Sequence, residues 1–203
     1  MRQAFTTIFD DETRGTLFND ILAFNLESDY TYKNHTKYSA LPPHLQTILR
    51  SDRLRLPSVK VLFQSTISRF GMSFSTHTTA SGDSMVIIGT VEKWSAARIT
   101  DIFVTSPRPD KPGELYLAVE IYCPLSHKQA QHDKYLRYPL AGRLFLNRIS
   151  DSLVVKADQI LCHYAATPMI IDQIEAECIH VLPLLRVSQQ SLKLRYSTDW
   201  LPV

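Results

Sequence analysis

Glycine, cysteine and long apolar runs are all scarce in this chain, and each scarcity excludes a class of protein. The six glycines form neither a G-x-x-x-x-G-K-[ST] nor a G-x-G-x-x-G pattern, so no phosphate-binding loop is visible. The three cysteines, Cys123, Cys162 and Cys178, are odd in number and far apart, which argues against a disulfide framework. No apolar run approaches the ~20 residues of a membrane span, and the acidic stretch MRQAFTTIFDDETRG is unlike a signal peptide. We therefore expect a soluble, intracellular protein of a reducing compartment, with no membrane partner.

An excess of one charge is also missing, because 22 lysine and arginine residues oppose 20 aspartate and glutamate residues. The formal charge of +2 is too small to diagnose nucleic-acid binding, which usually leaves a concentrated basic face. The position of the charges along the chain is therefore more informative than their sum.

The residues that could carry chemistry do not form a recognisable catalytic set. The segment 81–84 lacks the Gly-x-Ser-x-Gly turn that exposes a serine nucleophile, and it suits a loop before an apolar run. Pro109-Asp110 resembles the start of a nuclease motif, but Glu120 is followed by isoleucine and tyrosine instead of a lysine two positions on. The Pro-Asp pair is more simply a turn. We therefore expect a protein that is not an enzyme and has no small-molecule substrate.

One neighbourhood contains several residues of the types that bind zinc. Cys123, His127 and His132 lie close together in the sequence, and Asp133 adjoins them. A structural zinc site usually needs four protein ligands, and the paired C-x-x-C that often supplies two of them is missing. The pattern favours loop histidines beside a buried cysteine. We expect no metal and no other cofactor.

From residue 57 onward, the sequence consists of strand-length apolar runs separated by Pro, Gly, Asp and Ser. SVKVLFQSTISRF is β-branched and partly alternating, and MSFSTHTT and SMVIIGT follow a turn at Gly71. The pattern predicts a mainly β (α+β) fold with an antiparallel β-barrel over residues 57–186. Residues 187–203 are predicted to form a C-terminal tail.

Residues 1–56 show a helical pattern instead. Leu17, Phe18, Ile21 and Leu22 recur at helical spacing, and Pro43 suits the first turn of a second helix. The sequence therefore predicts a helical N-terminal arm, packed either on the barrel or on a partner.

Two hairpins are predicted in the second half of the chain. RITDIFV and ELYLAVEIY flank TSPRPDKPG, whose prolines and glycine predict an exposed tip at 105–113. RLFLN and SLVVKA flank ISD, which we interpret as a turn. DQILCHYA suits either a short helix capped by Asp158 or a strand, and ECIHVLPLLR suits a last strand.

The segment from Cys123 to Arg148 is the strongest binding candidate, because residues 124–140 form a long polar loop between two predicted strands. Five cations here oppose a single acid, Asp133, and tyrosines are interleaved: Lys128, Lys134, Tyr135, Arg137, Tyr138, Arg143 and Arg148. Such cations can contact phosphates or an acidic protein patch, while the rings can stack on bases or cover a peptide. The alternative is a solvated loop whose tyrosines pack on the barrel.

Three further aromatic residues, Trp94, Tyr116 and Tyr122, are candidates for binding. Their rings could line a site for a cationic side chain. The alternative is that they pack within the barrel, because a buried ring contributes a large apolar area.

The order of the apolar phrases resembles one known family. The phrases are ISRFGMSFST, SGDSMVII, WSAARITDIFV, YLAVEIYCPL, HDKYLRYPLAGRLFLN, VVKADQILCHYAATPM and ECIHVLPLLR, spanning about Ser58 to Arg186. They resemble the bromo-adjacent homology (BAH) module in the divergent version found in the C-terminal region of Plavaka-type transposon proteins of fungi. The strand pattern of BAH modules falls on Ile99–Phe103, Tyr116–Val119, Arg143–Phe145 and Val154–His163.

The resemblance implies a barrel that contacts chromatin proteins, a nuclear setting and an origin in a mobile element. Three rings that match the aromatic cage of histone-reading members cannot be placed in the sequence, and the chain is too short to add a transposase core. We therefore expect a noncatalytic, chromatin-associated protein-interaction module whose partner is a chromatin protein or a histone. Two alternatives stay open: sequence-nonspecific nucleic-acid binding through the basic loop, and a transposon relic without selected activity.

Overall fold

The computed structural model describes residues 38–51, 56, 58, 60–69, 72–90, 93–107, 113–138 and 141–184. Four sequence predictions lie wholly or partly outside these residues: the N-terminal helix with Leu17, Phe18, Ile21 and Leu22, the turn at Gly71, residues 108–112 of the hairpin tip predicted at 105–113, and the tail at 187–203. Within the described residues, no helix combines the length and the apolar character that crossing a lipid bilayer requires.

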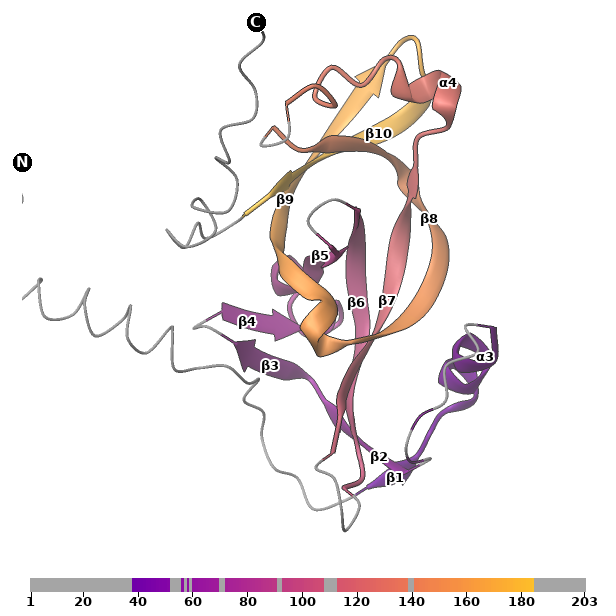
Figure 1. Cartoon of the computed structure of the whole chain (residues 1–203), viewed down its shortest axis with the longest axis vertical. Helices are drawn as coiled ribbons and strands as arrows, with labels where there is room; N and C mark the ends of the chain where they lie inside the picture. The colour runs from indigo at the N-terminus through magenta and orange to yellow at the C-terminus, as the bar shows by residue number, and fades with distance from the viewer. Residues whose placement is uncertain are drawn as a thin grey trace, which may run out of the picture.

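Six antiparallel strands close into a barrel at the centre of the molecule (Figure 1). They are β5 (Met85–Gly89), β6 (Trp94–Thr105), β7 (Leu115–Pro124), β8 (Arg143–Lys156), β9 (Ile160–Ile171) and β10 (Ala176–Pro183). Their order round the barrel is β6, β5, β9, β10, β8 and β7, and β7 pairs again with β6. The predicted mainly β fold with an antiparallel barrel is confirmed.

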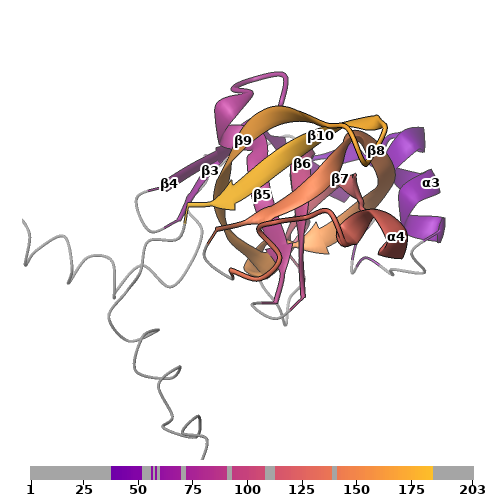
Figure 2. The same cartoon turned by 90° about the horizontal axis from the view of Figure 1, so that it is seen from above.

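Shorter elements surround the barrel (Figure 2). β1 (Ser39–Ala40) pairs with β2 (Lys60–Gln64), which in turn pairs with the second half of β6. β3 (Thr66–Arg69) and β4 (Met72–Ser75) form a separate two-stranded hairpin. The described helices are short: α3 (Pro43–Ser51), α4 (His127–Ala130) and single 3-10 turns at Gly82–Ser84 and Ala157–Gln159.

The predicted helix at Pro43 is confirmed as α3. Proline suits the first helical turn because its φ is already fixed near the helical value and its missing N–H would have had no partner there. Leu45 and Leu49, one turn apart, are buried and pack with Phe103 and Tyr116 of the barrel wall. This apolar contact holds α3 against the outside of β6, β7 and β8.

The first predicted hairpin is also confirmed. β6 and β7 pair from Ala97 opposite Ile121 to Val104 opposite Leu115, with one irregularity between Ile99 and Asp101. β-branched and aromatic side chains suit both faces of these strands, since one face packs in the barrel and the other against neighbouring elements.

The predicted turn at ISD is wrong. β8 runs without interruption from Arg143 to Lys156, so the two proposed strands of the second hairpin are one strand. Its first part, Arg143–Leu146, pairs with β10, whereas β7 pairs with it at Phe145 and again, after register shifts, from Ile149 to Lys156. Polar, exposed residues in the middle of β8 resemble a turn in the sequence, but here they lie where the pairing with β10 ends and the strand continues beside β7.

The alternatives for DQILCHYA are resolved in favour of a strand. A single 3-10 turn at Ala157–Gln159 leads directly into β9, which continues to Ile171. The last predicted strand is found as β10, which pairs with β9 along its whole length.

Two adjoining apolar clusters make up the barrel core. One cluster also takes in the β3–β4 hairpin, and its most buried members are Ile67, Phe74, Val86, Ala97, Ile99, Ile102, Leu117 and Val119. The other lies at the end of the barrel near β10, and its buried members are Ile87, Ala96, Phe145, Cys162, Tyr164, Ile179 and Val181. Residues from opposite sides of the barrel meet in the second cluster. The cluster therefore fixes the end of β7 and the start of β8, between which the long loop lies.

His163 fastens the β3–β4 hairpin to the barrel. Its ring lies parallel to Phe74, with the ring centres 4.4 Å apart. Nδ1 lies 3.0 Å from the main-chain oxygen of Met85, and Nε2 lies 2.9 Å from that of Ser73. One side chain of β9 therefore contacts both β5 and β4, which lie 78 and 90 residues before it in the sequence.

Candidate interaction surface

The described part of the loop between β7 and β8, residues 125–138 and 141–142, is folded rather than extended. It begins with a capping box, in which the Ser126 main-chain N–H donates to Oε1 of Gln129 at 3.1 Å and the Gln129 N–H donates to Ser126 Oγ at 3.4 Å. These bonds satisfy donors that the first turn of α4 leaves free. We call residues 125–142 the basic loop.

Asp133, the only acid in the basic loop, holds the loop to β8. Its carboxylate accepts hydrogen bonds from the main-chain N–H of Tyr135 at 2.9 Å and of Leu144 at 3.0 Å. The side chain is buried, with 7% of the residue exposed. A buried carboxylate needs such donors to offset its lost hydration. Asp133 therefore shapes the loop and does not offer its oxygens to a partner.

Tyr135 packs on the barrel. Its ring stacks on His180 of β10 with the ring centres 3.9 Å apart, and its hydroxyl lies 3.9 Å from the sulfur of Met169. His180 in turn lies 2.6 Å, through Nε2, from the main-chain oxygen of Ala141. The sequence left open whether Tyr135 is exposed for binding or packs on the barrel, and the structure favours packing.

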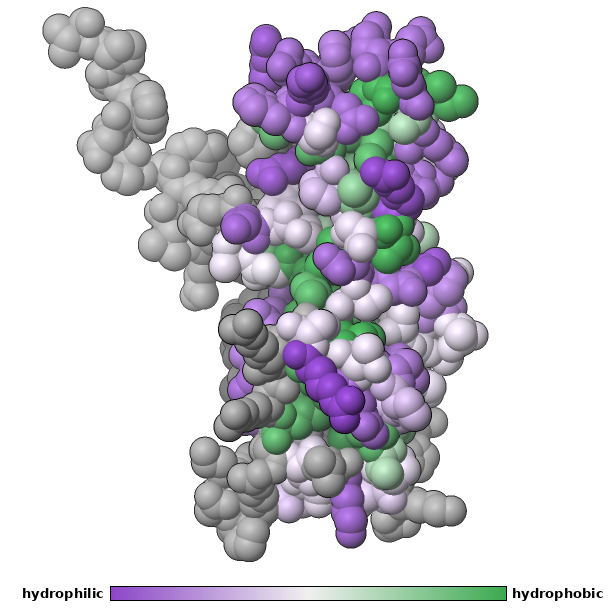
Figure 3. All heavy atoms as spheres, turned by 90° about the vertical axis from the view of Figure 1, so that its right-hand side faces the viewer, coloured by the Kyte–Doolittle hydropathy of each residue, from purple (hydrophilic) through white to green (hydrophobic). Residues whose placement is uncertain are grey.

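The outward side of the basic loop combines cations with exposed apolar residues. Lys128, Lys134 and Arg137 are exposed. Leu136 and Tyr138, next to Arg137 on either side, are 52% and 64% exposed. Figure 3 shows the same combination at the upper end of the molecule, where hydrophobic residues lie among hydrophilic ones. Exposed rings and aliphatic side chains held beside cations are typical of protein contact surfaces.

Arg143 and Trp94 meet at the base of the basic loop. The guanidinium carbon lies 4.9 Å from the centre of the indole ring, a cation–π contact. Trp94 also packs against Phe145, with ring centres 5.7 Å apart. Both residues are half-buried, so they support the surface and contribute only part of their own area to it.

The other two aromatic candidates lie inside the fold. Tyr122 is half-buried and packs in the barrel cluster near Tyr164. Burial, and then the neighbouring Tyr122, raise the pKa of the Tyr164 hydroxyl. Tyr116 lies on the α3 side, 2% exposed and stacked on Phe103, so it is not brought together with the basic loop. We leave Tyr116 out of the candidate surface.

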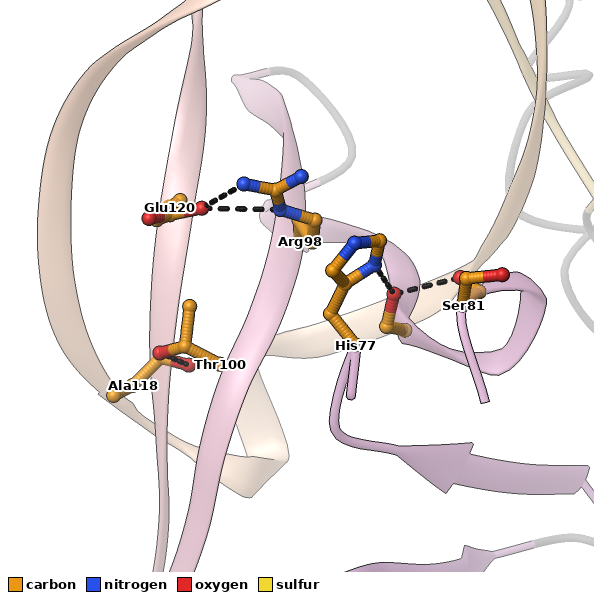
Figure 4. A network of polar contacts seen from close by, with 7 residues as sticks. His77, Ser81, Arg98, Thr100, Ala118 and Glu120 are labelled. Atoms are coloured by element: carbon orange, nitrogen blue, oxygen red, sulfur yellow. Dashed lines mark hydrogen bonds and ion pairs between the residues drawn. The ribbon is translucent and has the colours of Figure 1, made fainter. Parts of the chain in front are cut away.

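A second polar region lies in the barrel wall near the β4–β5 connection (Figure 4). Arg98 Nε donates to Oε2 of Glu120 at 3.0 Å, across β6 and β7. Beside this pair, Ser84 Oγ donates to the main-chain oxygen of Ser81 at 2.7 Å, and His77 Nδ1 lies 3.4 Å from the same Oγ. Ser84 is fully buried and its proton is already donated to a carbonyl. The His–Ser pair therefore fits a structural role better than a nucleophilic one.

The histidines near Cys123 do not gather with other ligands. Among the residues that the structure describes, no group of three or more His, Cys, Asp or Glu side chains is placed to hold a metal ion. His127 and His132 are exposed on the basic loop.

Comparison of the chain with models of protein families, with curated proteins and with solved structures finds no match. The BAH resemblance therefore rests on the order of the sequence phrases alone.

Sequence reasoning identified the exposed residues of the loop but missed its anchors. The S-x-x-Q pattern at Ser126 was readable as a capping box and would have predicted α4. Asp133 was considered beside the possible zinc ligands and as an opposing charge, although a lone acid in a basic loop is also a reasonable candidate for a main-chain contact. His180 carries no local signal, because its contact with Tyr135 depends on the closure of the barrel.

Proposed function

We propose that this chain is a noncatalytic protein-interaction module that binds an acidic protein surface through the basic loop. The observation that carries the proposal is the exposure of Leu136 and Tyr138 beside Lys134 and Arg137 on a loop anchored by Asp133. Anchoring matters because a pre-shaped loop loses little conformational entropy on binding. Apolar anchors surrounded by cations suit an acidic protein partner with an apolar depression.

The sequence resemblance to BAH modules supports chromatin as the setting. An acidic surface of histones is therefore the first partner class to test. A cage for a methylated lysine is not part of the proposal, because Arg143 already lies over Trp94. The barrel instead presents its loop as a positively charged, aromatic contact surface.

The test is a binding assay between the purified full chain and reconstituted nucleosomes, with naked DNA of the same length measured in parallel. Three variants are compared with the natural chain: Tyr138→Ala, Lys134→Ala/Arg137→Ala, and the matched control Arg50→Ala/Lys60→Ala. The control removes the same charge from exposed residues on α3 and β2, away from the loop. We expect Tyr138→Ala to weaken nucleosome binding about tenfold, as expected for an aromatic anchor that contributes over 1 kcal/mol.

A salt series separates protein contact from phosphate contact. If the cations bind DNA phosphates, affinity for naked DNA should match that for nucleosomes and fall steeply with salt, with a slope of about −0.9 per phosphate neutralised. If the loop binds protein, nucleosome affinity should exceed DNA affinity and depend on Tyr138. Equal affinity for both ligands, or no effect of Tyr138→Ala, contradicts the proposal.

A further inference from the structure

The turn that joins β9 and β10 carries charge of the opposite sign to that of the basic loop. Asp172, Glu175 and Glu177 are exposed here, and no lysine or arginine lies between Ile160 and Pro183. Ile170, opposite Glu177 in the β9–β10 pair, is 85% exposed. We call residues 170–177 the acidic hairpin. It is an exposed element that combines an apolar side chain with carboxylates.

The acidic hairpin and the basic loop lie side by side at one end of the barrel. Ile174 is buried in a cluster with Leu144 and Leu146 of β8, and Leu125 and Tyr135 of the basic loop pack on the same cluster. The Tyr135 hydroxyl reaches Met169 of β9. The apolar sides of the two elements therefore face each other, while their charged side chains are directed to solvent.

Their charges do not neutralise each other within one molecule. Across residues 113–138 and 141–184, no ion pair joins Lys128, Lys134 or Arg137 to an acid of the hairpin. One end of the molecule thus presents a positive patch and a negative patch next to each other, each with exposed apolar residues. Under a two-fold rotation, such a surface is complementary to itself.

We propose that two copies of this chain associate through this end of the barrel, with the basic loop of each copy against the acidic hairpin of the other. Lys134 and Arg137 would face Glu175 and Glu177 of the second copy. Leu136 and Tyr138 would cover the second copy's Ile170. Each contact occurs twice, so a modest charge attraction is doubled and apolar area is removed from water on both sides.

This inference goes beyond the proposed function, since it concerns a second copy of the chain and not the acidic partner. The two proposals share the basic loop. Self-association therefore covers the residues that would bind that partner, and binding of one excludes the other. The acidic hairpin belongs to self-association alone, which allows the two proposals to be tested separately.

The experiment is sedimentation velocity on the full chain over a wide range of protein concentration at low salt. The charge-reversal variants are Lys134→Glu/Arg137→Glu in the basic loop and Glu175→Lys/Glu177→Lys in the acidic hairpin. We expect the natural chain to form dimers as its concentration rises and each variant alone to stay monomeric. An equimolar mixture of the two variants should dimerise again, because each reversed element then meets an opposite charge on the other copy. Circular dichroism verifies that both variants are folded.

Recovery in the mixture supports the two-fold arrangement, because loss of folding in either variant could not produce it. A natural chain that is monomeric at every concentration overturns the inference, as does dimerisation that neither reversal affects or a mixture that stays monomeric. The hairpin variant separates this result from the proposed function. It retains the basic loop, so its nucleosome binding should be kept or strengthened even when its self-association is lost.

Discussion

Arg143 lies over the face of the Trp94 ring, with its guanidinium carbon 4.9 Å from the ring centre. The two residues stand at the starts of β8 and β6, which are not neighbours in the barrel at that point. Their contact crosses the barrel end beneath the basic loop. The Arg143 guanidinium also covers the indole face that a cationic ligand would need. The protein itself therefore supplies the cation of this cation–π contact.

Replacement of Arg143 should lower the free energy of unfolding, and the loss should be smaller when the new side chain keeps a positive charge. We expect Arg143→Ala to lower the free energy of unfolding by about 1 kcal/mol, the scale of a partly desolvated cation–π contact. Arg143→Lys should cost less, since an ammonium group can occupy a similar place. Urea denaturation followed by circular dichroism measures both. Equal losses for the two variants would show that a positive charge on a similar stem is not enough, and that the planar guanidinium group itself makes the contribution.

Asp133 should be essential for the shape of the basic loop. In Asp133→Ala, two main-chain donors, on Tyr135 and Leu144, lose their acceptor. We expect a loss of about 2–3 kcal/mol in unfolding free energy and faster hydrogen exchange at both amides. Asp151→Ala, which removes an exposed carboxylate from β8, is the matched control and should change little. Unchanged exchange at Leu144 would contradict the assigned role.

Gly142, where the basic loop enters β8, should not tolerate a side chain. Its φ is +81°, and a Cβ there would lie 2.1 Å from the main-chain oxygen of Val181. We expect Gly142→Ala to destabilise the fold by at least about 2 kcal/mol, because the backbone strain and the clash add. Gly82→Ala is the control, since nothing lies within 4 Å of its added Cβ. Thermal unfolding compares the two, and similar melting temperatures would contradict the prediction.

Cys162 should make stability fall at alkaline pH. Burial raises the pKa of its thiol from 9.0 to about 11, although a main-chain hydrogen bond from Leu184 acts in the opposite direction. The folded state therefore holds the proton more tightly than the unfolded chain does. This contribution is complete below pH 9 and is lost as pH rises toward 11. Denaturation at pH 8 and pH 10.5, compared between the natural chain and Cys162→Ala, should show a smaller decline in the variant.

The same burial predicts an order of chemical labelling. Cys162 and Cys178 are buried and burial raises the pKa of both thiols, whereas Cys123 is only half-buried. Because the thiolate is the reactive form, iodoacetamide should modify Cys123 first in the folded chain. Peptide mass spectrometry after brief exposure gives the order. Early modification of Cys162 would indicate that the barrel end opens readily.

His163 should contribute through the contacts of its two ring nitrogens with main-chain oxygens. His163→Phe retains a ring beside Phe74 but loses the contacts with the main-chain oxygens of Met85 and Ser73. We expect a loss of at least about 1 kcal/mol, the scale of one such hydrogen bond, because carbonyl oxygens only accept and the ring must supply the hydrogen. His127→Phe, at an exposed position on α4, is the control. Hydrogen exchange should rise in the β3–β4 hairpin of His163→Phe only, and protection equal to that of the natural chain would contradict the role of His163.

Local patterns predicted those parts of the fold whose cause is local. Pro43 predicted α3, and the Pro-rich segment between β6 and β7 predicted their hairpin. The turn at ISD was predicted wrongly, because exposed polar residues look alike whether they end a strand or bend one. What keeps β8 continuous is pairing with β10 on one part and with β7 on the other, and neither partner is visible locally.

Some residues of the candidate interaction surface could likewise be predicted from local sequence, and others could not. Lys134, Arg137 and Tyr138 could be named from composition, because exposed loop residues depend little on distant contacts. The sequence could not show whether Tyr135 is exposed or buried. Its ring position depends on His180, which follows it by more than forty residues in the sequence. The contact between Trp94 and Arg143 likewise forms only after the barrel has closed.

His163 has a further consequence, for the order in which the chain can fold. Its ring nitrogens contact main-chain oxygens 78 and 90 residues away, so neither contact can form until most of the barrel has been synthesised. Until β9 arrives, β5 has β6 on one side and an unpaired, apolar edge on the other. A translation product that stops before residue 160 would therefore expose a strand ready to pair with other chains, and we expect such products to aggregate rather than to remain as smaller barrels.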